Sequence, residues 1–132
     1  MEQTVTPYLM YEDAAAAIEF LTEAFGFREK MRTATDSGGI HAELEIAPDG
    51  GWIYVSQPAA GFRNPSVVGK TSLVYAIVDD VDGHYERAKA AGAQIIDEPK
   101  DQSYGHRHYG CTDPQGHEWY FASPIAVEAP IA

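Results

Sequence analysis

Three side chains able to do acid–base or cation chemistry recur at every second position of one short stretch. His41, Glu43 and Glu45 alternate with the apolar residues Ala42 and Leu44, so on a β-strand they would share one face. Imidazole and carboxylate groups can hold a divalent cation, and a carboxylate can act as a general base when its surroundings raise its pKa. Glu43 is therefore the candidate catalytic residue. The alternative is a solvent-facing strand surface without metal, and for metal binding we favour that alternative.

The other histidines and the single cysteine are weaker candidates. His106 and His108 share a face beside a predicted loop and are expected at the surface, and His84 falls on the exposed side of a predicted helix. His117 lies in a turn, where it would bond within the turn, and Cys111 is expected to be a small core residue. The chain carries no nucleophile elbow, phosphate-binding glycine loop or dinucleotide fingerprint.

Length and charge limit the classes of function. The 132 residues fit one domain, and no apolar stretch approaches the roughly 20 residues of a membrane helix. Twenty acidic residues against nine basic ones give a net charge of −11, which repels nucleic acid and anionic membranes and attracts cations; solubility alone also explains it. With one cysteine and no secretory signal, we expect a cytoplasmic protein without nucleic-acid or membrane partners.

The elements that would position these groups come in two similar halves. An apolar run ending in acidic residues occurs at 8–13 and again at 75–80, so that 67 residues separate Tyr8 from Tyr75. The offset is 66 between Tyr54 and Tyr120. A single repeat of about half the chain length indicates two halves of one pseudo-symmetric domain rather than a solenoid.

Within each half, the pattern predicts a strand, a helix and three further strands. Asp13 and Asp80 are predicted N-caps, and Gly26 and Gly92 are predicted helix ends. Alternating apolar and polar residues then predict strands, with two of them only weakly marked. The expected organisation is a first module over 4–60, a linker over 61–71, a second module over 72–123 and a tail over 124–132, with the later strands near 27–33, 40–47, 52–57, 94–97, 106–112 and 117–123.

Several motifs stand in a distinctive order. Tyr11-Glu12-Asp13 precedes an alanine-rich helix ending in Phe25-Gly26-Phe27, and Val78-Asp79-Asp80-Val81 precedes the second helix. Tyr104-Gly-His-Arg107 is followed by Thr112-Asp-Pro-Gln-Gly-His-Glu-Trp-Tyr-Phe-Ala122. Together they resemble the glyoxalase/bleomycin-resistance/extradiol-dioxygenase (vicinal oxygen chelate) superfamily over about 4–123. The resemblance implies an α+β fold of two βαβββ modules with curled mixed sheets around a cleft and helices on the outer face. It also implies a homodimer.

The resemblance also implies where a metal would bind. Counting from the helix caps and turns places the superfamily's ligand positions at Thr6, Tyr54, Leu73 and Tyr120. Leu73 offers no donor atom, Thr6 only a neutral hydroxyl, and phenols titrate near pH 10. We therefore expect no metal and no other cofactor, as in the metal-free, bleomycin-resistance-like branch.

Strand alternation then predicts the cavity wall. If the former ligand positions face inward, so do their neighbours on the same face. The predicted wall is rich in rings and hydroxyls, with acids in one module and an arginine in the other, which suits a planar or partly cationic molecule. The expected ligand-binding residues are Tyr8, His41, Glu43, Trp52, Tyr54, Tyr75, Arg107, Tyr109 and Tyr120.

Two classes of function fit this wall. The first, which we favour, is a protein that sequesters a cationic or aromatic small molecule without metal, in the manner of antibiotic-resistance proteins. The second is a glyoxalase-like lyase or isomerase, supported by the acidic strand carrying Glu43 opposite Arg107. Whether there is turnover stays open at this point.

Overall fold

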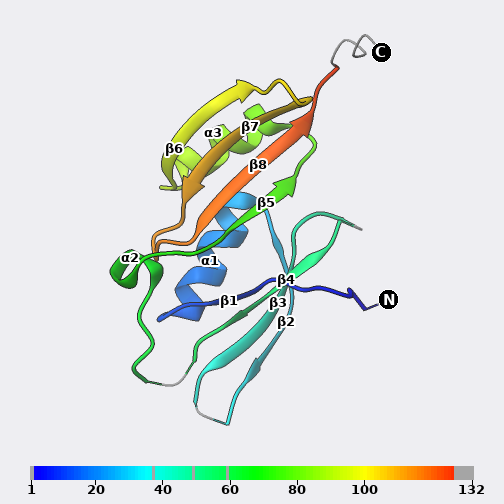
Figure 1. Cartoon of the computed structure of the whole chain (residues 1–132). Helices are drawn as coiled ribbons and strands as arrows, with labels where there is room; N and C mark the ends of the chain where they lie inside the picture. The colour runs from blue at the N-terminus through cyan, green and yellow to red at the C-terminus, as the bar shows by residue number, and fades with distance from the viewer. Residues whose placement is uncertain (1, 37, 49, 59, 127–132) are drawn as a thin grey trace.

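Each half of the chain folds into one strand, one helix and three further strands (Figure 1). The computed structural model describes residues 2–36, 38–48, 50–58 and 60–126. The first module consists of β1 (Tyr8–Met10), α1 (Ala14–Phe25), β2 (Arg28–Ala34), β3 (Ile40–Glu45) and β4 (Trp52–Ser56). The linker holds the one-turn helix α2 (Pro65–Val68), and the second module consists of β5 (Leu73–Ile77), α3 (Val81–Ala90), β6 (Gln94–Asp101), β7 (His106–Thr112) and β8 (Glu118–Pro124).

Each module forms one mixed four-stranded sheet. The strand orders are β1-β4-β3-β2 and β5-β8-β7-β6, so the first strand of each module lies parallel to its last strand. The other neighbours are antiparallel. The register pairs Tyr8 with Tyr54 and, in the second sheet, Tyr75 with Tyr120. The predicted α+β fold of two βαβββ modules is confirmed.

The two long helices begin at their predicted N-caps, and α1 ends at the predicted Gly26, whereas the C-cap of α3 is Ala91, one residue before the predicted Gly92. The Asp13 carboxylate accepts a hydrogen bond from the Ala16 amide at 3.0 Å, and Asp80 accepts one from Gly83 at 3.1 Å. Gly26 ends α1 in the left-handed region, with φ 73°. Within the described ranges, no helix is long and apolar enough to cross a membrane.

The covered sides of both sheets meet in one hydrophobic core. Helices α1 and α3 contact each other, and Figure 1 shows α1 between the two sheets. The ring of Phe25, at the end of α1, lies 5.3 Å from that of Trp119 and 4.7 Å from that of Phe121, both on β8. The core therefore continues from the first module into the second, and each sheet turns its other side away from it.

Two parts of the chain differ from the expected outline. Strand β6 runs to Asp101 rather than ending near residue 97, with irregularities in its register after Ile95 and Asp97. His84 was expected on the exposed side of its helix, and this is wrong. It is partly buried beside α1, where its ring lies 5.8 Å from that of Phe25. The predicted tail lies outside the described residues from residue 127 onward.

Candidate ligand-binding faces

The side of each sheet that no helix covers carries most of the predicted ligand-binding residues. On β4, Ile53 and Val55 are fully buried in the core while Tyr54 between them is partly exposed. On β8, Trp119 and Phe121 are likewise buried on either side of Tyr120. We call the uncovered sides the first open face (Tyr8, Met10, His41, Glu43, Glu45, Trp52 and Tyr54) and the second open face (Leu73, Tyr75, Ile77, His106, His108, Glu118 and Tyr120).

Three rings gather on the first open face. The Tyr8 ring lies 5.6 Å from that of Tyr54 in an edge-to-face arrangement, and the His41 ring lies 5.1 Å from Tyr54. The Tyr8 hydroxyl is 3.2 Å from His41 Nδ1. The structure therefore brings together three of the predicted residues from strands β1, β3 and β4.

Two glutamates lie on this face, and one of them is paired with cationic side chains. Glu45 accepts a hydrogen bond from Arg28 at 3.1 Å and lies 3.9 Å from Lys30 Nζ. Lys30 also sits 5.5 Å from the centre of the Trp52 ring. Within the described part of the chain, Glu43 has no ion-pair partner and the buried Nε1 of Trp52 has no acceptor. Glu43 is thus the carboxylate on this face that a ligand can use.

Five rings gather on the second open face. Tyr75 Oη lies 2.9 Å from His106 Nδ1 and 3.3 Å from His108 Nδ1, and Tyr104 Oη lies 3.0 Å from His108 Nδ1. The Tyr75 and Tyr120 rings are parallel within 4°. Partial burial, together with the neighbouring Tyr104, raises the pKa of Tyr75 to about 12, so its phenol is neutral at physiological pH.

The Tyr120 ring lies against β7 at Gly110, which has no side chain to displace it. A Cβ atom at Gly110 would lie 2.5 to 2.9 Å from atoms of the Tyr120 ring, so only glycine leaves room for it. The Tyr120 hydroxyl donates a hydrogen bond to the Asp97 carboxylate on β6. This bond, more than burial, raises the pKa of Tyr120 to about 12.

The two faces repeat one arrangement. Tyr8 and Tyr75 occupy equivalent positions on the first strands, and each places its hydroxyl 3.2 to 3.3 Å from a histidine Nδ1. The two histidines, His41 and His108, are 67 positions apart, like the two tyrosines. Tyr54 and Tyr120 complete the two clusters, so the sequence repeat extends to a Tyr–His–Tyr cluster on each open face.

Two predicted residues point the other way. Arg107 binds Asp82 of α3 at 3.0 Å and Asp101 at 3.1 Å, on the covered side of β7. Tyr109 is fully buried in the core, where its hydroxyl bonds to His84. The predicted orientation of Arg107 and Tyr109 is therefore wrong, because the alternation along β7 was placed one residue out of phase.

The same error in phase left His106 and His108 out of the predicted cavity wall. With the phase reversed, the His-x-His pattern of β7 faces outward beside Tyr75, together with Tyr104 from the preceding loop and Asp97 from β6. The pairing of Cys111 with Trp119 across β7 and β8 is the signal that determines the phase. Both residues are fully buried, and residues opposite one another in neighbouring strands share a face.

The superfamily's metal positions do not fit a divalent ion in this chain. Leu73 carries a hydrocarbon side chain, and Tyr120 is a neutral phenol already bonded to Asp97. Thr6 offers only a hydroxyl, which accepts a hydrogen bond from Gln3. Among the residues that the structure describes, no group of three or more His, Cys, Asp or Glu side chains is placed to hold a metal ion.

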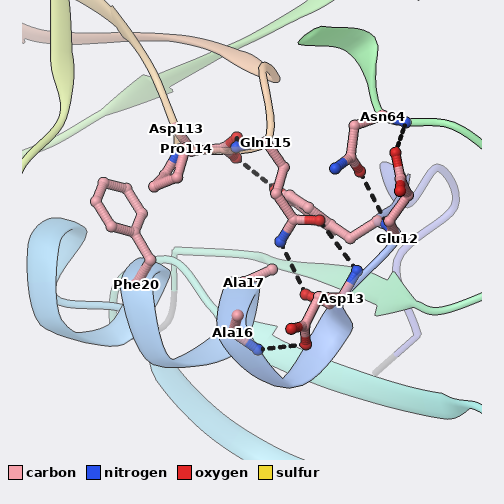
Figure 2. Close-up of a pocket in the computed structure, with 10 residues that line it drawn as sticks. Glu12, Asp13, Ala16, Ala17, Phe20, Asn64, Asp113, Pro114 and Gln115 are labelled. Atoms are coloured by element: carbon pink, nitrogen blue, oxygen red, sulfur yellow. Dashed lines mark hydrogen bonds between the residues drawn. The ribbon is translucent and has the colours of Figure 1, made fainter. Parts of the chain in front are cut away.

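A separate pocket lies between the modules rather than on either open face. It has a volume of about 330 Å³ and includes Tyr11, Phe20 and Pro114 in its lining, and none of the predicted ligand residues. Figure 2 shows its polar groups bonded to each other. The Gln115 amide donates to the Asp13 carbonyl at 2.8 Å and accepts from the Asp13 amide at 3.0 Å. These bonds join the modules and leave few groups for a ligand.

The fold and the sequence are similar to those of several known proteins. The chain is 34% identical to uncharacterised proteins of Mycobacterium bovis and Mycobacterium tuberculosis, covering 95% of this chain and 86% and 76% of those proteins. The crystal structure of TioX from Micromonospora sp. ML1 is 31% identical, with a TM-score of 0.74 over 96% of this chain and 100% of that chain.

More distant structures share the fold alone. The fosfomycin resistance protein FosX from Listeria monocytogenes is 18% identical, with a TM-score of 0.66 over 95% of both chains. Glyoxalase I from Zea mays is 18% identical, with a TM-score of 0.72 over 91% of this chain and 47% of that chain. Residues 3–121 match the family model described as Glyoxalase/Bleomycin resistance protein/Dioxygenase superfamily, and the chain belongs to that superfamily.

Proposed function

We propose that the chain is a small-molecule-binding protein that works as a homodimer and holds an aromatic or cationic ligand without metal. The observation that carries this proposal is the pair of ring clusters exposed on the open faces. Tyr8 is 53% exposed and Tyr75 is 40% exposed. Stacked or edge-to-face rings contribute about 0.5–1.5 kcal/mol each beyond their buried area, so several rings give a planar ligand substantial affinity.

The exposed apolar side chains support a second copy as the occupant of the open faces. Met10 on the first open face, and Leu73 and Ile77 on the second, are each more than 40% exposed, and apolar side chains exposed in this way favour an interaction site. Within one chain each open face lies on the side of its sheet opposite to the shared core. A cleft with a ring cluster on both walls therefore requires the first face of one protomer and the second face of its partner.

The charge of the chain supports a ligand with a cationic group. The net charge is −11, and Glu43 lies beside the rings without an ion-pair partner among the described residues. A carboxylate next to aromatic faces suits an amine through charge and cation–π attraction. TioX and FosX share the fold, and FosX is named for fosfomycin resistance; protection against a toxic small molecule is the role we propose for binding here.

The enzymatic alternative rests on Glu43 alone. Its other support, an arginine opposite the acidic strand, is lost because Arg107 binds Asp82 and Asp101 on the covered side. Without that arginine, Glu43 is the one residue of the argument for a lyase or isomerase that stays on an open face. Binding without turnover is the better account of these residues.

Titration of planar aromatic compounds against the fluorescence of Trp52, in buffer with a chelator, tests the proposal. We expect saturable quenching with one ligand-binding site for each first open face paired with a partner's second open face. Sedimentation equilibrium should show a dimer. The buried Trp119 also fluoresces, so Trp52→Phe is the control that assigns the signal. A monomer at high concentration, or no saturable binding by any aromatic compound, contradicts the proposal.

A further inference from the structure

The histidines of the second open face are oriented by phenols. His106 Nδ1 lies 2.9 Å from Tyr75 Oη, and His108 Nδ1 lies 3.0 Å from Tyr104 Oη. Tyr75 Oη is also 3.3 Å from His108 Nδ1, so the two hydroxyls make three contacts with the two ring nitrogens. A phenol is the better donor and a neutral imidazole nitrogen the better acceptor, so the favoured arrangement has each hydroxyl donating and each Nδ1 accepting.

This pattern decides where the imidazole proton lies. A neutral imidazole carries one proton, and when Nδ1 accepts a hydrogen bond the proton is on Nε2. On the first open face Tyr8 Oη is 3.2 Å from His41 Nδ1, the counterpart of the 3.3 Å contact between Tyr75 Oη and His108 Nδ1. The recurrence at equivalent positions of both modules indicates a built feature rather than a chance contact.

The Nε2 atoms are available to a ligand. Within the described ranges, Nε2 of His106 and of His108 makes no hydrogen bond, in contrast to Nε2 of His117, which bonds to the Met10 carbonyl at 2.7 Å. His108 lines a pocket of about 610 Å³ together with Asp97. A ring-sized molecule has space there next to His108.

We propose that His106 and His108 present Nε2–H donors that select ligands bearing a hydrogen-bond acceptor, such as a carbonyl oxygen, on a planar aromatic frame. The inference rests on the proposed function and adds the polar group that the second open face recognises. Glu43, on the first face, recognises an amine, whereas the second face recognises a carbonyl. A ligand that spans both walls carries both groups on one aromatic frame.

Two probes with the same ring system separate this selection from simple stacking. Naphthalene-2-carboxamide carries a carbonyl acceptor, and (naphthalen-2-yl)methylammonium carries only donors and a charge. We expect His106→Phe and His108→Phe, which keep a ring but remove the donor, to weaken carboxamide binding by about five- to tenfold, since a hydrogen bond contributes about 1 kcal/mol. The dissociation constant of the ammonium probe should change less than twofold.

The phenols provide a second test. Tyr75→Phe and Tyr104→Phe remove the hydroxyls that keep the imidazole proton on Nε2, so both variants should weaken carboxamide binding. In the wild type, ¹⁵N NMR should show the proton of His106 and His108 on Nε2. Tyr85→Phe is the matched control, because Tyr85 is buried in α3 and its hydroxyl makes no hydrogen bond to a described residue.

The outcomes distinguish the inference from the function it rests on. If both probes bind and the histidine variants weaken them equally, or neither probe is affected, the rings only stack and the inference is overturned while the binding function stands. A wild-type Nδ1–H tautomer also overturns it. If no aromatic compound, these two probes included, binds the wild-type dimer, the binding function fails with it.

Discussion

Tyr11 donates a 2.7 Å hydrogen bond to the buried carboxylate of Asp113, across 102 positions of the sequence and from one module to the other. The Trp119 indole donates to the same oxygen at 3.1 Å, and the amides of Gln115 and His117 donate to the other oxygen. Four donors thus surround a carboxylate that is 4% exposed. A buried charge persists only when it is hydrogen-bonded in this way.

Loss of the Tyr11 hydroxyl should therefore destabilise the whole fold. Tyr11→Phe leaves one carboxylate oxygen with a single donor, and hydrogen bonds to charged groups contribute about 1.5–3 kcal/mol. We expect the free energy of unfolding in urea to fall by about that amount with an unchanged m-value. Tyr85→Phe, which removes a hydroxyl without a bonded partner, should change it by less than half as much. An equal loss in both variants would mean that the bond between the modules contributes little.

The parts of the fold that were predicted correctly are those with local signals. Asp13 and Asp80 each stand directly before a helix and cap its first turn. Gly26 follows the last residue of α1, where the left-handed backbone conformation favours glycine. The repeat of Tyr8 as Tyr75 indicated that both halves have the same succession of strands and helix. These features depend on a few neighbouring residues and are visible in the sequence.

The phase of β7 had no such local signal. From His106 to Thr112 polar, aromatic and small residues alternate without a clear apolar side, and a one-residue slip exchanges the two faces completely. Strand alternation with the wrong phase assigned Tyr109 to the cavity wall, yet it is the partner of a histidine in the core. Only the pairing with β8 and the packing of α3 determine which side is covered, and both are long-range.

Acid should loosen the contact between the two helices. His84 lies between modules, with Nε2 3.1 Å from the Phe25 carbonyl and Nδ1 bonded to the Tyr109 hydroxyl. Burial, against the favourable bond to Phe25, lowers the pKa of His84 to about 4. The folded state therefore binds fewer protons than the unfolded state, whose histidine titrates near 6.5. Stability is full above about pH 6.5 and is lost as the pH falls toward 4.

Urea unfolding at pH 7 and pH 5 checks this contribution. The lowered pKa of His84 corresponds to a loss of about 2 kcal/mol in the free energy of unfolding between pH 7 and pH 5. Carboxylates also titrate at the lower end, so the comparison is with His84→Gln, which should show a smaller fall over the same interval. Identical pH dependence in the two proteins would show that His84 is not the group responsible.

Filling the space at Gly110 should release Tyr120 from Asp97. Gly110→Ala places a methyl group within 3 Å of the Tyr120 ring, which forces the ring off β7 and breaks its bond to Asp97. The pKa of Tyr120 should then fall from about 12 toward 10. Ultraviolet titration of tyrosinate follows this change, with Tyr120→Phe identifying the signal. An unchanged titration would mean that the sheet shifts to accommodate the methyl group.

Metal content tests the mismatch of the superfamily positions. With a hydrocarbon side chain at Leu73 and phenol side chains at Tyr54 and Tyr120, we expect less than about a tenth of an equivalent of zinc, nickel, manganese or iron to remain after loading and desalting. Retention of one equivalent would point to ligands outside these positions. Loss of that metal in Glu43→Gln would then assign it to the acidic strand of the first open face.

A pair of substitutions on the first open face separates binding from catalysis. Tyr54→Ala removes the ring that contacts both Tyr8 and His41, and we expect it to weaken binding of an aromatic ligand by about 1–3 kcal/mol, within the range that loss of a stacking ring costs elsewhere.

Glu43→Gln keeps the shape of the side chain and removes its charge. For a binding protein, it should weaken a cationic ligand and leave a neutral aromatic one within about twofold, because only the amine uses the carboxylate. For an enzyme, the same variant would abolish product formation from a bound substrate while the affinity stays nearly constant. Measuring affinity by calorimetry and turnover by NMR on the same sample decides between the two, since charge-dependent affinity without turnover supports binding and turnover lost at constant affinity supports catalysis.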